Sequence, residues 1–193
     1  MNLRNRLIIA VLILTVIIAL IFSCIRRNDA VETILSSMLS TKINLSLSYM
    51  ECFPNSVITY NDLVGRDSIS KYTLVVFTDS TECTSCNVSR ISNWEEVTQD
   101  FFFDSCRSAR LVFIFSPSQK KIQEVRQIVE ESSVDWPIYL DTANVFQRSN
   151  KQIPDNQLFH VFLLNENNEI LCVGNPLYNE KLRNIYKRII KGE

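Results

Sequence analysis

From residue 71 onward the chain alternates short apolar runs with segments of helical periodicity, and this alternation constrains its fold most. The run YTLVVFT at 72–78 is continuous, apolar and rich in β-branched residues, which is typical of a strand buried on both faces. The run ARLVFIF at 109–115 has the same character. The whole pattern predicts the order β-α-β-α-β-β-β-α. Strands joined by helices pair in parallel, so we expect an α/β domain with a central mixed sheet and helices on both faces.

The other segments of the alternation are assigned by the same periodicities. The expected helices cover 87–102, 118–133, 143–150 and 179–193. A third strand is expected at 136–141. Residues 159–176 contain two apolar runs about an Asn-rich turn, which predicts a hairpin that adds antiparallel strands to the sheet.

Two cysteines follow the first strand at the point where the first helix begins. Cys83 and Cys86 would lie in the first helical turn, where free N–H groups and the helix dipole stabilise a thiolate. An attacking sulfur with a resolving sulfur within reach is what thiol–disulfide exchange requires. The pair therefore predicts a redox couple, and a static disulfide or two inert thiols is the alternative. A zinc site built from two Cys-x-x-Cys pairs is excluded, because no second pair occurs.

The N-terminal residues 1–27 carry a second strong signal. Two arginines precede an apolar stretch at 7–22, which reaches residue 25 if weakly polar residues are included. That length suffices to cross a bilayer core of about 30 Å. We expect an uncleaved transmembrane anchor that leaves the domain on the extracytoplasmic, periplasmic side. The alternatives are a lipoprotein signal with Cys24 as the lipidated residue, and simple secretion.

Three parts follow from these patterns. Residues 1–27 form the anchor or lipoprotein signal, residues 28–70 a stalk and a turn-rich connecting segment with a short strand or two, and residues 71–193 the α/β domain. Helical spacing in the stalk runs over 28–50. The net charge of −1, with both signs interspersed, gives no reason to expect a nucleic-acid partner. With only 3 glycines and no phosphate-binding loop, no cofactor is expected either.

The motifs around the cysteine pair resemble those of a known family. The segments VVFTDSTECTSC, WPIYLDTANVFQR and FHVFLLNENNEILCVGNP make the chain similar to the thioredoxin superfamily, in its membrane-anchored thiol–disulfide oxidoreductase and redoxin (TlpA-like) branch. The resemblance covers residue 71 to about residue 190. It implies a thioredoxin-like fold in which Cys83 is the attacking nucleophile and Cys86 the resolving thiol. It also implies protein thiols and disulfides as partners, together with an upstream electron donor.

Two residues depart from the family pattern near the pair. Glu82 stands where the family usually has tryptophan, and a carboxylate beside Cys83 is expected to oppose thiolate formation. His160, the only histidine, aligns with the family's cis-proline, which faces the cysteine pair in that fold. His160 is therefore a candidate catalytic residue that tunes Cys83 and carries protons. The alternatives are an ordinary polar residue, or a third ligand that binds Cu(I) or Zn(II) together with Cys83 and Cys86.

We therefore expect a membrane-tethered extracytoplasmic thiol–disulfide oxidoreductase that acts on protein disulfides. One alternative is a metal-binding module similar to the Sco-type copper chaperones, built on the two cysteines and the histidine. Another is a thioredoxin-fold binding module with weak redox activity, which the absence of the cis-proline suggests. Among the other thiols, Cys172 is expected in the core, and a Cys52–Cys106 disulfide is conceivable.

Overall fold

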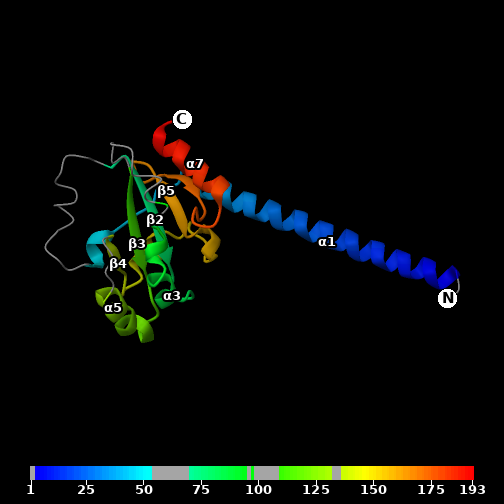
Figure 1. Ribbon diagram of the computed structural model, residues 1–193, viewed down its shortest axis with the longest axis horizontal. Helices are drawn as coiled ribbons and strands as arrows, with labels where there is room; N and C mark the ends of the chain where they lie inside the picture. Colours follow the sequence, from blue (N-terminus) through cyan, green and yellow to red (C-terminus); the bar gives the residue numbers. More distant parts are fainter. Residues whose placement is uncertain (1–2, 54–69, 95–96, 98–108, 132–135) are drawn as a thin grey trace. The chain divides into compact units, whose positions relative to one another are not determined.

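The computed structural model describes residues 3–53, 70–94, 97, 109–131 and 136–193. The chain divides into two compact units, Met1–Met38 and Leu39–Glu193. The first unit is a single helix, α1, at Leu3–Met38 (Figure 1). Its large apolar side chains from Leu12 to Ile25 are exposed. Among the described residues, no helix combines the length and the apolarity of a membrane span.

The helix expected for the stalk is shorter than the sequence pattern predicts. It ends at Met38 instead of continuing to residue 50. Ser40 adopts a φ of 62°, which a regular helix cannot accommodate. The N–H groups of Ser40 and Ile43 then donate to the carbonyls of Ile170 and Asn168, at 2.8 Å each. This stretch of chain is therefore hydrogen-bonded beside a strand of the second unit.

The second unit is built on a six-stranded sheet with the order β1-β4-β3-β2-β5-β6. The strands are β1 at Glu51–Phe53, β2 at Tyr72–Thr78, β3 at Ala109–Phe115, β4 at Ile138–Leu140, β5 at Val161–Leu164 and β6 at Ile170–Val173. β2, β3 and β4 are parallel, whereas β1, β5 and β6 pair antiparallel with their neighbours. The expected hairpin is the β5–β6 pair.

β2 lies inside the sheet between β3 and β5, with Val75 opposite Val112 on one side and Phe162 on the other. The sequence predicts that this strand is buried on both faces. Most of its residues are buried, but Val76 is only partly so. An incompletely covered residue in an internal strand indicates an opening in the layer above it.

The helices of the second unit are short. They are α3 at Thr84–Val88, α5 at Ile122–Glu131, α6 at Val145–Ser149 and α7 at Glu180–Lys191, with single 3₁₀ turns η1 at Leu47–Tyr49, η2 at Ile91–Asn93, η3 at Gln119–Lys121 and η4 at Gln157–Phe159. The helix expected to begin at the cysteine pair and to continue to residue 102 begins at Thr84, as expected, but its α-helical turn ends at Val88. Residues 95–96 and 98–102 of that prediction lie outside the described part of the chain.

Side chains alternate between the two faces of the sheet. On one face, Leu74 and Phe113 share a buried cluster with Val88 of α3, Val125 of α5 and Tyr186 of α7. On the other face, the ring of Phe77 packs against Phe146 of α6 with centroids 4.8 Å apart. Helices therefore cover both faces, as the sequence predicts.

The connection of these elements defines the fold (Figure 1). A parallel β2-α3-β3 unit is extended by α5 and β4, and an antiparallel β5–β6 hairpin followed by α7 completes the sheet on the other side of β2. This is the thioredoxin-like arrangement, and the expected α/β fold class is confirmed. The C-terminal end of β2 leads into α3, which places the cysteine pair just beyond the C-terminal end of this internal strand.

Candidate active site

A tight turn connects β2 to α3 and presents the cysteine pair. Oδ1 of Asp79, which is 1% exposed, accepts hydrogen bonds from the Thr81 N–H at 2.8 Å, the Thr81 hydroxyl at 2.7 Å and the Glu82 N–H at 3.2 Å. An aspartate that bonds the backbone two and three residues ahead replaces the regular turn geometry. Asp79 thereby fixes the turn after β2 and so positions Glu82 and Cys83 relative to the sheet.

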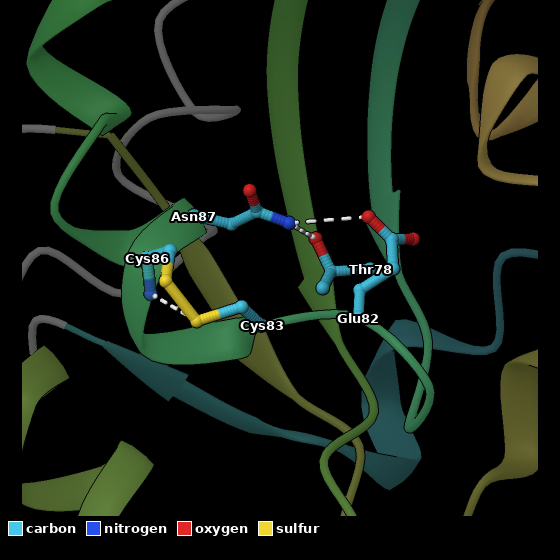
Figure 2. The surroundings of a disulfide bond; sticks show 5 residues. All are labelled: Thr78, Glu82, Cys83, Cys86 and Asn87. Atoms are coloured by element: carbon cyan, nitrogen blue, oxygen red, sulfur yellow. Dashed lines mark hydrogen bonds between the residues drawn. A yellow bond between two sulfur atoms is a disulfide. The ribbon is translucent and has the colours of Figure 1, made fainter.

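Cys83 and Cys86 are joined in a disulfide whose Cα atoms are 5.3 Å apart, and both residues are exposed. The Cys86 N–H in the first turn of α3 points at Sγ of Cys83, at 3.4 Å, as Figure 2 shows. The Asn87 N–H donates to the Cys83 carbonyl at 3.0 Å. The structure thus brings the two predicted sulfurs together, and it aims a backbone donor at the sulfur that would carry the thiolate charge.

The carboxylate of Glu82 points away from the sulfurs (Figure 2). Its Oε2 accepts a hydrogen bond from Nδ2 of Asn87 at 3.2 Å, and the same amide nitrogen donates to Oγ1 of Thr78 at 3.2 Å. Its Oε1 lies 2.8 Å from Nδ1 of His160. The carboxylate therefore belongs to a hydrogen-bonded cluster behind the disulfide, and its charge faces the imidazole.

His160 is 1% exposed and directly precedes β5. Its Nε2 lies 2.8 Å from the carbonyl oxygen of Pro154, and its ring packs on Phe77 at 4.9 Å between centroids. A carbonyl oxygen can only accept, so Nε2 carries a hydrogen. When Glu82 is ionised, Nδ1 must donate to it as well, and the ring is then an imidazolium. Glu82 and His160 thus form a partly buried pair, ionic when the ring is protonated, between the β2–α3 turn and the start of β5.

The pKa of His160 is raised above its ordinary value. Burial has the largest influence and lowers the pKa, because it disfavours the charged ring. The hydrogen bond to Glu82, the hydrogen bond to the Pro154 carbonyl, and the negative charges of Glu82 and Asp79 raise it, and together they outweigh burial. The environment of His160 is therefore arranged to retain a proton.

The donor atoms for a metal are engaged with one another in this structure. The sulfurs of Cys83 and Cys86 are bonded together, and both ring nitrogens of His160 contact oxygen atoms. The three-ligand set of cysteines and histidine is therefore not assembled in this oxidised form. Ligand atoms of Asp79, Glu82 and His160 do lie within 4.8 Å of one another, but hydrogen bonds and the ion pair account for that proximity.

Sequence reasoning singled out Glu82 and His160 separately but missed the residues that connect them to the fold. Asp79, Asn87 and the carbonyl of Pro154 belong to no motif that a single sequence displays. The available signal was local, since Asp79 directly follows a strand and aspartate favours turns at such positions. The contact of Glu82 with His160 depends on pairing between segments 78 residues apart, which no local pattern encodes.

Outside the site, Cys172 is a buried core residue, as expected, and burial raises the pKa of its thiol. Cys52 lies on β1, opposite Tyr139 of β4. Cys106, its conceivable disulfide partner, falls outside the described residues. Trp94 is 4% exposed and packs in the core beside Phe113, with centroids 5.9 Å apart.

Comparisons with known proteins give structural neighbours only. No protein-family model matches the chain, and no curated protein matches it. Among solved structures, an uncharacterized thioredoxin-like protein from Porphyromonas gingivalis has 18% identity, with a TM-score of 0.43 over 65% of this chain and 76% of that one. The thioredoxin domain of a thiol-disulfide oxidoreductase from Bacteroides vulgatus has 15% identity and a TM-score of 0.44, over 63% and 80%. StoA from Bacillus subtilis has 21% identity and a TM-score of 0.41, over 60% and 81%.

Proposed function

We propose that this chain is a membrane-tethered, extracytoplasmic thiol–disulfide oxidoreductase acting on protein disulfides through Cys83 and Cys86. One observation carries the proposal: an exposed disulfide spans the first turn of α3, directly after a buried strand of a thioredoxin-like sheet. Exposure gives a partner access to the sulfurs, and the short span lets either cysteine displace the other.

In the reducing direction, the Cys83 thiolate attacks one sulfur of the substrate disulfide. A Cys83–substrate disulfide forms, and the other substrate sulfur leaves as a thiolate that takes up a proton. Cys86, as a thiolate, then attacks Sγ of Cys83 and releases the second substrate sulfur. The substrate gains two electrons and two protons, and the chain ends with the Cys83–Cys86 disulfide. A dithiol electron donor returns the couple to its reduced form, and the reverse sequence oxidises a substrate dithiol.

Tethering is proposed from the N-terminal sequence. The apolar stretch at 7–22 lies within α1, whose large side chains from Leu12 to Ile25 are exposed in the described structure. Apolar side chains exposed along a helix favour an apolar surrounding such as lipid. Fractionation of cells that express the full chain tests this step: recovery in the soluble fraction, with none in the carbonate-washed membrane, would overturn it.

Single cysteine variants test the exchange reaction. Cys83→Ser is expected to abolish reduction of a peptide disulfide, because the attacking sulfur is lost. Cys86→Ser is expected to accumulate a mixed disulfide with the substrate, visible by mass spectrometry, because the resolving sulfur is lost. Cys52→Ser changes a thiol outside the couple and serves as the matched control. Activity that survives Cys83→Ser would disprove the proposal, and tight substrate binding without turnover in the unmodified chain would favour a binding module instead.

A further inference from the structure

A cavity opens beside the cysteine pair, on the α3 side of the sheet. It has a volume of about 180 Å³, and its walls include Glu82, which precedes Cys83, and Asn87, which follows Cys86. Its floor includes Val76, the residue of β2 that is only partly buried. Val76 is therefore only partly buried because this cavity lies above it. It reaches from the edge of the disulfide-bearing turn to the sheet itself.

Apolar and aromatic residues form part of the lining of the cavity, beside polar ones. Val76 and Phe113 come from the sheet, Trp94 follows η2, and Leu177 comes from the segment between β6 and α7. Trp94 and Phe113 meet edge to face, and Phe113 stacks with Phe115 at 6.5 Å between centroids. A further aromatic ring in this space would continue the edge-to-face packing, which is favourable beyond the area that it buries.

The polar groups of the cavity carry little unbalanced charge. Asn87, Asn175 and Gln157 contribute neutral amides, and Glu82 is already paired with His160. Arg90 is exposed and contributes the remaining cation. A lysine side chain in the cavity would lose hydration and would find no acidic lining residue except Glu82, which already contacts His160. A glutamate side chain would lose hydration and would find only the exposed Arg90 as a cation outside that pair. The walls therefore favour an uncharged guest that has an aromatic face.

The size of the cavity restricts the guest further. Sites for cofactors and small molecules usually measure about 300–1,000 Å³, whereas this cavity measures about 180 Å³. That volume suits one side chain of a polypeptide whose backbone passes over the mouth. In an extended segment, alternate side chains point to the same side, so a residue close to the reacting cysteine can enter the cavity while the cysteine meets Cys83.

We propose that this cavity is a specificity pocket that takes an aromatic side chain, such as phenylalanine, from a substrate protein near its reacting disulfide. The inference rests on the proposed exchange function and specifies its substrate. The full chain, pre-reduced, is mixed with disulfide peptides in which phenylalanine occupies each position within three residues of the cysteine in turn, and the second-order rate constant is measured. At one position we expect the rate constant of the phenylalanine peptide to exceed those of the alanine, aspartate and lysine peptides by about tenfold, because burying one such side chain contributes about that much.

Two cavity variants and one matched control complete the test. Val76→Phe fills the cavity and should remove the preference for phenylalanine. Tyr178 lines the mouth and is 72% exposed, so Tyr178→Ala leaves the fold intact and should reduce the preference severalfold. Tyr49, which is 77% exposed and does not line the cavity, provides the control Tyr49→Ala, expected to keep the preference. The reduction rate of glutathione disulfide, which has no aromatic group, should be the same in Tyr49→Ala as in the unmodified chain.

The outcomes separate the two proposals. If neither glutathione disulfide nor any peptide is reduced, the exchange function itself is wrong. If both are reduced but phenylalanine stays within twofold of alanine at every position, the specificity pocket is wrong and the exchange function stands. A preference that persists in both Tyr178→Ala and Val76→Phe places recognition elsewhere on the chain and also overturns the pocket.

Discussion

At the scale of single residues, Glu82 and His160, which depart from the pattern of the family that the chain resembles, form one structural feature. A glutamate next to Cys83 and a histidine that is 1% exposed each introduce a group that is unfavourable alone. In the structure, Glu82 and His160 contact each other at 2.8 Å and balance each other's charge. The expected opposition of Glu82 to the Cys83 thiolate is therefore weakened, because its negative charge faces the imidazole. Removing one partner of such a pair leaves an uncompensated group, which costs more than the pair itself contributes.

The ion pair predicts a pH dependence of stability. The pKa of His160 is raised in the folded chain above its ordinary value of about 6.5. At any pH between these two pKa values, the folded state therefore binds more protons than the unfolded state. The stabilisation is fully present below about pH 6.5 and is lost as the pH rises through the folded pKa. In urea unfolding of the oxidised chain, the midpoint urea concentration should therefore decrease as the pH is raised from 6 to 9.

Glu82→Gln is the matched variant for this effect. The amide keeps the size of the side chain but removes the charge that raises the pKa of His160. We expect a smaller fall of the urea midpoint with rising pH in Glu82→Gln than in the unmodified chain. Equal slopes in the two proteins would show that His160 does not hold its extra proton through Glu82.

Among the secondary-structure elements, the sequence located those with a strong local pattern and left imprecise those that depend on pairing. The apolar runs identify β2 and β3, and the helical periodicity of apolar residues identifies α5 and α7, because burial imposes a period on each. The three-residue strand β1 is too short to show a period, so the sequence predicts only a short strand or two in the connecting segment, and pairing with β4 determines where β1 lies. In the same way, the cysteine spacing predicts the pairing of Cys83 with Cys86, but the contact of Glu82 with His160 requires β2 and β5 to be neighbours.

The short helix α6 provides a prediction about capping. Asp141 is 1% exposed, and its carboxylate accepts hydrogen bonds from the N–H groups of Val145 and Phe146 at 2.8 Å each, and from the Ser116 hydroxyl at 3.1 Å. Asp141→Ala leaves these donors without a partner and should lower the free energy of unfolding by about 2–4 kcal/mol, because bonds to charged groups contribute about 1.5–3 kcal/mol each and relaxation recovers part. Urea denaturation measures the loss.

A second aspartate nearby serves as the control for this capping role. Asp155 is exposed and accepts one hydrogen bond, from Nε2 of Gln147 at 2.9 Å. Asp155→Ala should therefore change the free energy of unfolding by less than about 0.5 kcal/mol, as exposed surface positions usually do. Similar losses in the two variants would mean that Asp141 does not hold α6 in place.

The attachment of α3 to β2 depends on Asn87, and this makes a further prediction at the same scale. Its amide donates to both Thr78 and Glu82 at 3.2 Å, so it joins the helix, the strand and the ion pair. Asn87→Ala should lower the free energy of unfolding by about 1–2 kcal/mol through the lost hydrogen bonds. Asn87→Asp, nearly identical in shape, should lose more at pH 8, because its carboxylate faces Glu82. If aspartate is tolerated as well as alanine, Glu82 is not a carboxylate in this cluster.

For the whole molecule, the division into two units separates the proposed tether from the proposed site of exchange. The unit Leu39–Glu193 contains the whole sheet, the disulfide, the ion pair and the cavity. The unit Met1–Met38 is the single helix α1 and contributes no strand to that sheet. The groups that would carry exchange are thus supplied by one unit, and the proposed tether by the other.

This separation predicts that a chain beginning at Leu39 folds and exchanges disulfides without α1. Its rate constant with a soluble peptide disulfide should lie within about threefold of the full chain's, because the cysteine pair and its hydrogen-bonded surroundings are complete. A threefold range corresponds to activation free energies that differ by less than about 0.7 kcal/mol. The same shortened chain should leave the membrane fraction entirely. Activity lost together with membrane association, in a shortened chain whose circular dichroism shows a folded α/β domain, would mean that α1 takes part in the reaction as well as in attachment.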